Sequence, residues 1–170
     1  IKNNIYSFNR ISTSDTVESG ESLTVGLKYS KTNKFNREFI AMNIARNYRN
    51  DEDLDLPKSS TLGKKTSNIV GSFNLKPNDY LSFDYNFIKD ENLQKSKYDL
   101  FKTNLKVNNF VTSFEFLEEN DEVGSESYAS LKSEYSINDN YSVKFSTRRN
   151  QKTDLTEFYN LMYQYKNDCL

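Results

Sequence analysis

The chain of 170 residues contains no His and no Trp, and it has only one Cys, two Pro and five Gly. Without His it lacks the commonest general base and a common zinc ligand, and it cannot form Ser-His or Cys-His nucleophile pairs. Lys and Arg number 23 against 24 Asp and Glu, so there is no excess of positive charge to favour nucleic acid. We therefore expect neither an enzyme nor a nucleic-acid-binding protein, and we expect no cofactor and no metal site.

Long apolar runs are missing too. The longest spans residues 39–42, far short of the roughly 20 residues that a membrane-spanning helix needs. Hydrophobic residues, Tyr included, make up 35% of the chain, whereas soluble domains reach about 45–50% without counting Tyr. Disorder is also a poor fit, because 14% of the residues are aromatic and the net charge is only −1. The sequence therefore indicates an ordered protein that is poor in apolar residues.

What the sequence does have is a hydrophobic pattern with a period of two, in runs of about ten residues. In residues 22–30, for example, Leu23, Val25 and Leu27 alternate with polar residues or Gly. This spacing is typical of a β-strand with one apolar face. We expect nine such strands, around residues 22–30, 39–46, 67–75, 80–88, 98–107, 110–116, 129–137, 141–145 and 159–165.

The connections between these strands alternate in length. Segments rich in Asn, Asp and Pro predict tight turns at residues 76–79, 106–109, 137–140 and 166–169. Longer polar loops are expected at residues 47–65, 89–97, 118–125 and 149–154. The prediction is an all-β fold, an antiparallel up-and-down meander of about nine strands with its tight turns at one end and its long loops at the other.

Strands of this length, abundant aromatic residues and this loop asymmetry are the signature of an outer-membrane β-barrel. We predict that residues 1–170 belong to one such domain and form a partial wall of a large transmembrane barrel. One alternative is a soluble extracellular or periplasmic β-domain, which would need a second layer to cover its aromatic face. Another is a different outer-membrane barrel, a porin or receptor that transports small solutes.

The alternation divides the strand residues into two predicted sets. The residues expected to face lipid are Leu23, Val25, Leu27, Leu81, Phe83, Tyr85, Phe114, Phe116, Val143, Phe145, Leu161 and Tyr163. Those expected to face the lumen are Lys28, Asp84, Lys132, Glu134, Lys144 and Arg148. We interpret the second set, which has charges of both signs, as a hydrated barrel interior rather than a specific conduit.

Three motifs resemble known sites without completing them. Residues 51–55 offer the acidic positions that begin a Ca²⁺ loop, yet Leu56 and Leu62 stand where Gly and a bidentate Glu are needed. Residues 63–66 resemble part of a phosphate loop, but Lys58 replaces its first Gly. The acidic run at residues 118–122 lacks the apolar surroundings of a catalytic carboxyl pair. Solvated loops are expected at all three places.

Several segments resemble the C-terminal barrel of the LPS-assembly proteins of the LptD family, also called OstA or Imp. They are Asn4-Ile5-Tyr6-Ser7-Phe8-Asn9-Arg10, Asp15, Glu18-Ser19-Gly20, Gly26-Leu27-Lys28-Tyr29, residues 77–85, Asn140-Tyr141-Ser142-Val143 and Arg148-Arg149. The ending Tyr165-Lys166-Asn167-Asp168-Cys169 is similar to the family's Tyr-x-x-acidic-Cys ending. This last segment is the most distinctive of the set.

The resemblance implies a barrel that follows a periplasmic β-jellyroll, contains an LptE-like plug lipoprotein, and assembles lipopolysaccharide into the outer leaflet of the outer membrane. Its partners would be lipopolysaccharide, that plug lipoprotein, outer-membrane lipid and, through the N-terminal domain, periplasmic LPS-bridge proteins. The chain opens on Ile1 rather than Met, and it would be a slice of the wall without that domain and without the terminal barrel strands. Its location would be the cell outer membrane of a Gram-negative bacterium.

Cys169 follows a polar turn, where burial is not expected. An odd exposed thiol in an oxidising compartment suggests a partner thiol in this chain or in another, and the residues alone leave open whether it has one. The resemblance implies a disulfide with a cysteine near the N-terminal domain. Some family members have two adjacent cysteines at this position, whereas here the neighbour is Leu170.

Overall fold

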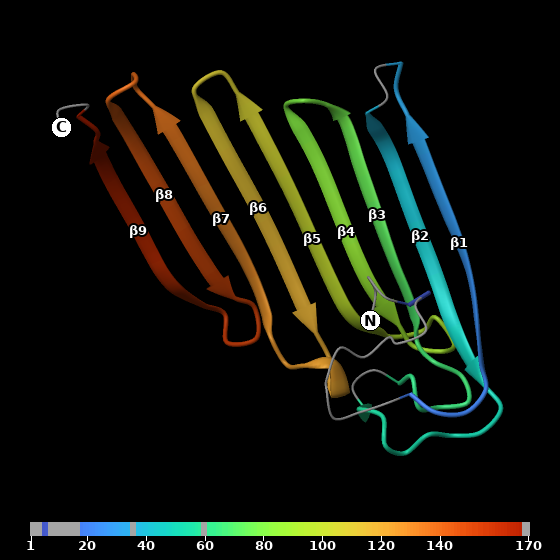
Figure 1. Ribbon diagram of the computed structural model, residues 1–170. Helices are drawn as coiled ribbons and strands as arrows, with labels where there is room; N and C mark the ends of the chain where they lie inside the picture. The colour runs from blue at the N-terminus through green and yellow to red at the C-terminus, as the bar shows by residue number, and fades with distance from the viewer. Residues whose placement is uncertain (1–4, 7–17, 35–36, 59–60, 168–170) are drawn as a thin grey trace.

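The computed structural model describes residues 5–6, 18–34, 37–58 and 61–167, and most of them belong to one open β-sheet. Within these residues nine strands lie side by side in chain order, each antiparallel to the next (Figure 1). They are β1 Ser22–Thr32, β2 Glu38–Arg49, β3 Ile69–Asn78, β4 Leu81–Lys89, β5 Ser96–Val107, β6 Phe110–Glu119, β7 Ser127–Ser136, β8 Tyr141–Asn150 and β9 Leu155–Tyr165. A single turn of 3-10 helix, η2 (Asp121–Val123), follows β6. The predicted all-β meander is confirmed.

The two ends of the sheet differ in their connections, as predicted. At the short-turn end, drawn at the top of Figure 1, residues 79–80, 108–109 and 137–140 join consecutive strands. At the long-loop end, drawn at the bottom, the connections are residues 50–68, 90–95, 120–126 and 151–154. No helix in the described part of the chain is long and apolar enough to cross a membrane.

Some strands extend beyond their predicted limits. Strand β8 continues to Asn150 and β9 begins at Leu155, so the loop between them is shorter than expected. Strand β3 continues through Pro77, because a register shift between Leu75 and Asn78 leaves this residue, which has no N–H, outside the regular ladder. The turn predicted at residues 76–79 therefore lies at residues 79–80.

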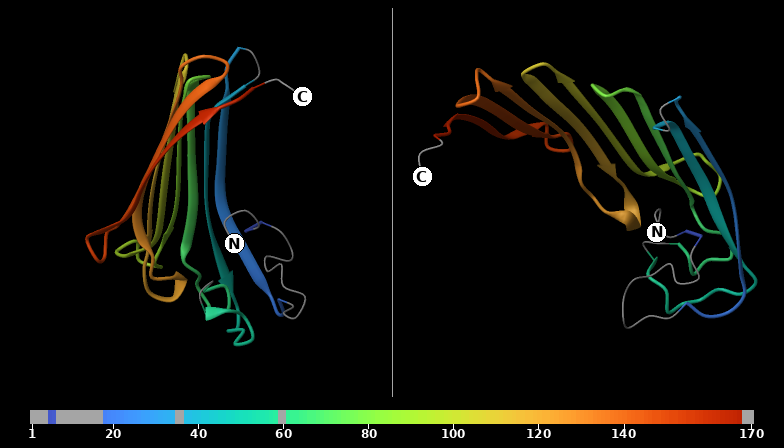
Figure 2. Two further views of the ribbon diagram at one scale, coloured as in Figure 1. Left: turned by 90° about the vertical axis from the view of Figure 1, so that its left-hand side faces the viewer. Right: turned by 45° about the horizontal axis from the view of Figure 1, so that its top comes forward.

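The sheet is curved, and its two faces can be told apart. Figure 2 shows the strands along an arc with residues 5–6 on its concave side. There Tyr6 Oη donates a hydrogen bond of 2.9 Å to Asn43 Oδ1. Asn43 therefore points to the concave face. Directly paired residues of antiparallel strands point to the same face, and successive residues of one strand point to opposite faces. Following the pairs from Asn43 across the sheet thus assigns each regularly paired residue to the concave or the convex face. In this part of the chain β1 and β9 form the two edges of the sheet.

The small apolar core lies against the concave face at the long-loop end. Ala45 and Val70 are paired neighbours on β2 and β3, and they form a buried cluster with Ile5. Leu56 and Leu62 from the 50–68 loop complete the cluster, and Leu62 is 0% exposed. A connecting loop, rather than a second sheet, therefore supplies the cover at this end.

Candidate functional site

The convex face carries most of the apolar side chains of the strands. The register places on this face all twelve residues that were predicted to face lipid. Phe101 bridges two of them, with ring centroids 6.4 Å from Phe83 and 6.4 Å from Phe114. At the sheet edges the apolar side chains are open to the surroundings, since Leu23 is 63% exposed and Leu161 is 73% exposed. The convex face is thus largely apolar and aromatic, with a few polar residues such as Thr112, Ser133 and Asp99 among the apolar ones.

The concave face carries most of the polar side chains. The register places on it all six residues that were predicted to face the lumen. One row crosses six strands in register, from Asn74 through Asp84, Lys102, Glu115 and Ser130 to Arg148. The set predicted to face the lumen did not include Lys102 and Glu115, although their strand positions alternate with apolar ones.

Three of the four charged residues in this row, here called the central row, have an oppositely charged partner in the sheet. Lys102 Nζ lies 2.5 Å from Glu115 Oε2, and Tyr128 Oη donates a 2.7 Å hydrogen bond to the other oxygen of that carboxylate. The Arg148 guanidinium lies 3.8 Å from the centre of the Tyr128 ring, and its Nε lies 2.9 Å from Glu157 Oε2. This arrangement holds charged groups of both signs on one face without a large net charge.

A buried ion-pair cluster lies at the long-loop end, where only solvated loop was expected. Arg49 Nη1 lies 2.8 Å from Glu18 Oε1, and Arg49 Nη2 lies 3.4 Å from Asp53 Oδ2. The exposed fractions of these three side chains are only 1%, 6% and 7%. The expectation of a solvated acidic loop at residues 51–55 is therefore wrong for Asp53, because its carboxylate is turned toward the end of β2.

The carboxylate of Asp53 has further hydrogen bonds. It accepts them from the backbone N–H of Ser19 at 3.2 Å and from the hydroxyl of the same residue at 3.0 Å. The backbone hydrogen bond from Ser19 is the largest of the influences that lower the pKa of Asp53, and the charge of Arg49 adds to it. Asp53 is therefore negatively charged at neutral pH, as an ion pair with Arg49 requires.

Gly63 contacts the backbone of Asp53 from the other side of the same loop. Its carbonyl accepts a 2.8 Å hydrogen bond from the Asp53 N–H, and a Cβ at this position would lie 2.2 Å from the Asp53 carbonyl oxygen. Gly63 therefore has a packing role, while Lys64 and Lys65 are exposed as expected. Among the described residues no group of His, Cys, Asp and Glu could hold a metal ion.

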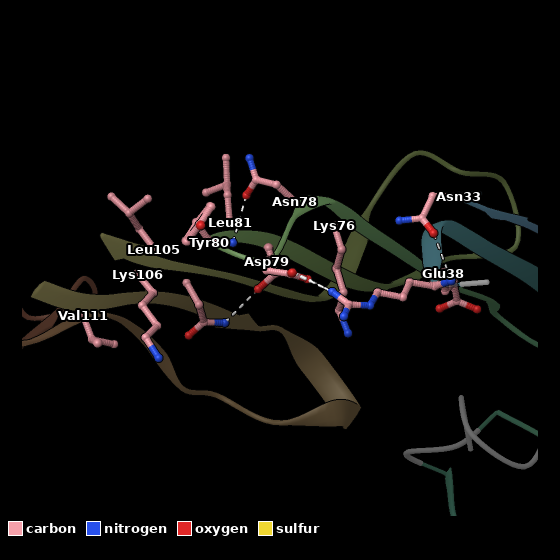
Figure 3. Close-up of a pocket in the computed structure, with 13 residues that line it drawn as sticks. Asn33, Glu38, Lys76, Asn78, Asp79, Tyr80, Leu81, Leu105, Lys106 and Val111 are labelled. Atoms are coloured by element: carbon pink, nitrogen blue, oxygen red, sulfur yellow. Dashed lines mark hydrogen bonds and ion pairs between the residues drawn. The ribbon is translucent and has the colours of Figure 1, made fainter. Parts of the chain in front are cut away.

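A hollow of about 570 Å³ lies at the short-turn end (Figure 3). Its lining includes Arg37, Asp79, Lys76 and Lys106. Arg37 Nη1 lies 2.5 and 2.6 Å from the two carboxylate oxygens of Asp79, and both side chains are largely exposed. In contrast to the long-loop end, the charged groups here are open to solvent.

Cys169 lies outside the described residues, so its pairing stays a prediction.

Comparison with known proteins identifies the family. The sequence matches the family model LptD, LPS transport system D, over residues 2–141. No curated protein matches the chain at a significant level. The matched range contains β1 to β7, and β8 and β9 continue the same meander. The resemblance seen in the sequence is thereby confirmed, and the chain belongs to the LptD family, LPS transport system D.

Proposed function

We propose that this chain is part of the wall of an outer-membrane β-barrel that assembles lipopolysaccharide into the outer leaflet. Membership of the LptD family supports a role in LPS transport. The observation that carries the finer proposal is the separation of apolar and polar residues between the convex and concave faces across nine described strands. In a membrane barrel the first face meets lipid and the second lines a hydrated lumen.

The wall acts without catalysis in this proposal. Strand pairing satisfies the backbone N–H and C=O groups, so that a closed barrel has no open edge in the hydrocarbon region. The edges at β1 and β9 would pair with further strands of the same barrel. By the usual asymmetry of such barrels the short-turn end faces the periplasm and the long-loop end faces the outside.

The proposed partners follow from the two faces and from the family. Lipopolysaccharide would contact the concave face, and outer-membrane lipid would contact the convex face. An LptE-like lipoprotein would plug the lumen, and periplasmic LPS-bridge proteins would dock on the N-terminal domain. The family match favours this assignment over a porin or receptor for small solutes.

Arginine substitutions on neighbouring residues test which face meets lipid. Phe83 and Phe114 lie on the convex face, whereas Ser82 and Ser113, adjacent to them in the same strands, lie on the concave face. We expect Arg at either Phe to lower the unfolding free energy of the full-length protein by roughly 2–4 kcal/mol near the bilayer midplane. Arg at either Ser should have much less effect. The measurement is urea unfolding in lipid vesicles, and equal tolerance at the two kinds of position would contradict the proposal.

The disulfide proposed for Cys169 has a separate test. The intact protein from cells should show a slow-migrating band on a non-reducing gel, because a long-range disulfide changes the size of the denatured chain. The variant Cys169→Ser should lose this band, and reduction of the wild-type protein should have the same effect. A wild-type protein whose mobility does not respond to reduction would show that Cys169 has no such partner.

A further inference from the structure

Two adjoining hollows form a groove near the short-turn end, and most of the regularly paired residues that line it lie on the concave face. The first, of about 570 Å³, is lined by residues that include Lys76, Lys106 and Val111. The second, of about 340 Å³, is lined by residues that include Val111, Lys132 and Met162. Because Val111 lines both, the hollows are contiguous, and we call them together the short-turn groove.

Two cross-strand rows project side chains into this groove. One row runs from Lys106 through Val111, Glu134 and Lys144 to Met162. The next row runs from Ser82 through Asn104, Ser113, Lys132 and Ser146 to Asn160. In Figure 3 Lys76, Lys106 and Val111 extend from one side of the sheet, while Leu81 and Leu105 extend from the other. Leu81 and Leu105 also line the first hollow but lie on the convex face, so it is the side of the groove formed by Lys76, Lys106 and Val111 that belongs to the face proposed to line the lumen.

Positive charge exceeds negative charge in the groove. Its lining contains five cations, Arg37, Lys76, Lys106, Lys132 and Lys144, and three anions, Glu38, Asp79 and Glu134. Asp79 is paired with Arg37, and Glu134 Oε1 lies 3.3 Å from Lys144 Nζ. The ammonium groups of the other three lysines form no ion pair or hydrogen bond within the described part of the chain. The groove thus differs from the central row, where Lys102 is paired with Glu115.

The three unpaired lysines lie on alternate strands. Lys76, Lys106 and Lys132 lie on β3, β5 and β7, and neighbouring strands are about 4.8 Å apart. Successive lysines are therefore separated by roughly 10 Å across the sheet. This spacing suits a ligand that carries several anionic groups better than one small anion, and lysine ammonium groups bind phosphate well. Hydroxyl and amide groups between the lysines, such as those of Ser113 and Asn104, can form hydrogen bonds to sugar hydroxyls.

We propose that the short-turn groove binds the phosphate-bearing saccharide of lipopolysaccharide at the periplasmic entrance of the lumen. Lys76, Lys106 and Lys132 contact the phosphates, and the Ser and Asn side chains of the groove contact the sugar. The inference rests on the proposed function, which places the concave face inside a barrel and the short-turn end toward the periplasm. It adds a substrate-binding site to a face that was otherwise interpreted as a hydrated interior.

The test compares two charge-matched triple variants of the intact protein in detergent. In the groove variant Lys76, Lys106 and Lys132 are replaced by Gln, and in the control variant Lys31, Lys64 and Lys65 are replaced by Gln. All six side chains are exposed, so neither variant should disturb folding. Folding is checked on a gel, where a folded barrel migrates differently before and after heating. The control lysines lie outside the groove, on the convex face at Lys31 and in the 50–68 loop.

We expect the groove variant to bind purified lipopolysaccharide at least about tenfold more weakly, because the loss of even one hydrogen bond to a charged group weakens binding by about this factor. The salt dependence of binding should become shallower, and the control variant should bind like the wild type. Lipopolysaccharide treated with a phosphatase should bind wild-type protein weakly and should not distinguish the two variants. Restoring charge with Arg at the three groove positions should restore binding.

Three results would overturn the inference. The first is equal binding of lipopolysaccharide by the groove and control variants. The second is equal binding of phosphatase-treated and untreated lipopolysaccharide by the wild-type protein. The third is binding of phosphatidylglycerol micelles that is as tight as the binding of lipopolysaccharide and depends as strongly on the groove lysines. The last result would mean that the groove takes any phosphate-bearing lipid. These outcomes are separate from the arginine test at Phe83 and Phe114, which asks only whether the convex face meets lipid.

Discussion

Two arginine–carboxylate pairs at opposite ends of the sheet have similar distances but different surroundings. At the long-loop end Arg49 lies 2.8 Å from Glu18, and the two side chains are 1% and 6% exposed. At the short-turn end Arg37 lies 2.5 Å from Asp79, and the exposed fractions are 64% and 71%. Distance alone would rank the pairs as equals. The difference in burial means that only the first should contribute strongly to stability if one partner is removed.

The length of the connections explains this difference. The 50–68 loop is long enough to fold back over the concave face, where Leu56 and Leu62 bury apolar surface and Asp53 closes on Arg49. The turns at residues 79–80 and 108–109 only reverse the chain. At the short-turn end the charged side chains of Arg37 and Asp79 therefore stay open to solvent.

Removal of the buried arginine should have the largest effect. The substitution Arg49→Met keeps most of the side-chain volume but leaves the Glu18 carboxylate buried without its cation, which costs roughly 3–5 kcal/mol. The unfolding free energy of the intact protein in detergent measures the loss, and hydrogen exchange of residues 50–68 should show that this loop opens first. A change below about 1 kcal/mol would mean that the cluster contributes no more than a surface pair does.

Truncation of the loop's buried leucine should have a somewhat smaller effect. Leu62 is 0% exposed, so Leu62→Ala leaves a cavity and should cost about 3 kcal/mol. Leu54 of the same loop is 90% exposed, and Leu54→Ala is the matched control with an expected change within about 0.5 kcal/mol. The same unfolding measurement applies. If the two alanine variants were equally stable, the loop would not cover the concave face in the folded protein.

The smallest effect is expected at the short-turn end. Arg37→Met removes a guanidinium group, as Arg49→Met does, but from an ion pair that is mostly exposed to solvent. The unfolding free energy should fall by less than about 1 kcal/mol, because exposed ion pairs exchange one polar environment for another. Measured beside Arg49→Met under one condition, this variant isolates the contribution of burial. Equal losses for the two variants would contradict the comparison.

Local pattern was sufficient to predict the strands and the faces. Alternation along β4 separates Phe83 and Tyr85 from Asp84, and the same rule separates Phe114 from Ser113 in β6. These assignments hold because side chains of a strand alternate between two faces whatever the strand packs against. Pattern was less informative at strand ends, where the irregularity at Pro77 extended β3 beyond its predicted limit.

Contacts between distant residues could not be predicted in the same way. The sequence around Asp53 resembles a solvated acidic loop, and nothing local indicates that Ser19 donates two hydrogen bonds to its carboxylate or that Glu18 pairs with Arg49. Nor does alternation reveal that Lys102 lies opposite Glu115 in the neighbouring strand whereas Lys106 lies opposite Val111. Such differences depend on register, which is set by pairing along whole strands.

By itself the sequence determined the fold class, the division into two faces, the alternation of short and long connections and the resemblance to the LptD family. Only the tertiary structure decided which charges are paired, which loop covers the concave face and where unpaired lysines line a groove. The physical reason is that strand periodicity is a property of each residue's place in its own strand. Burial and charge balance arise only when strands and loops far apart in the chain are brought together.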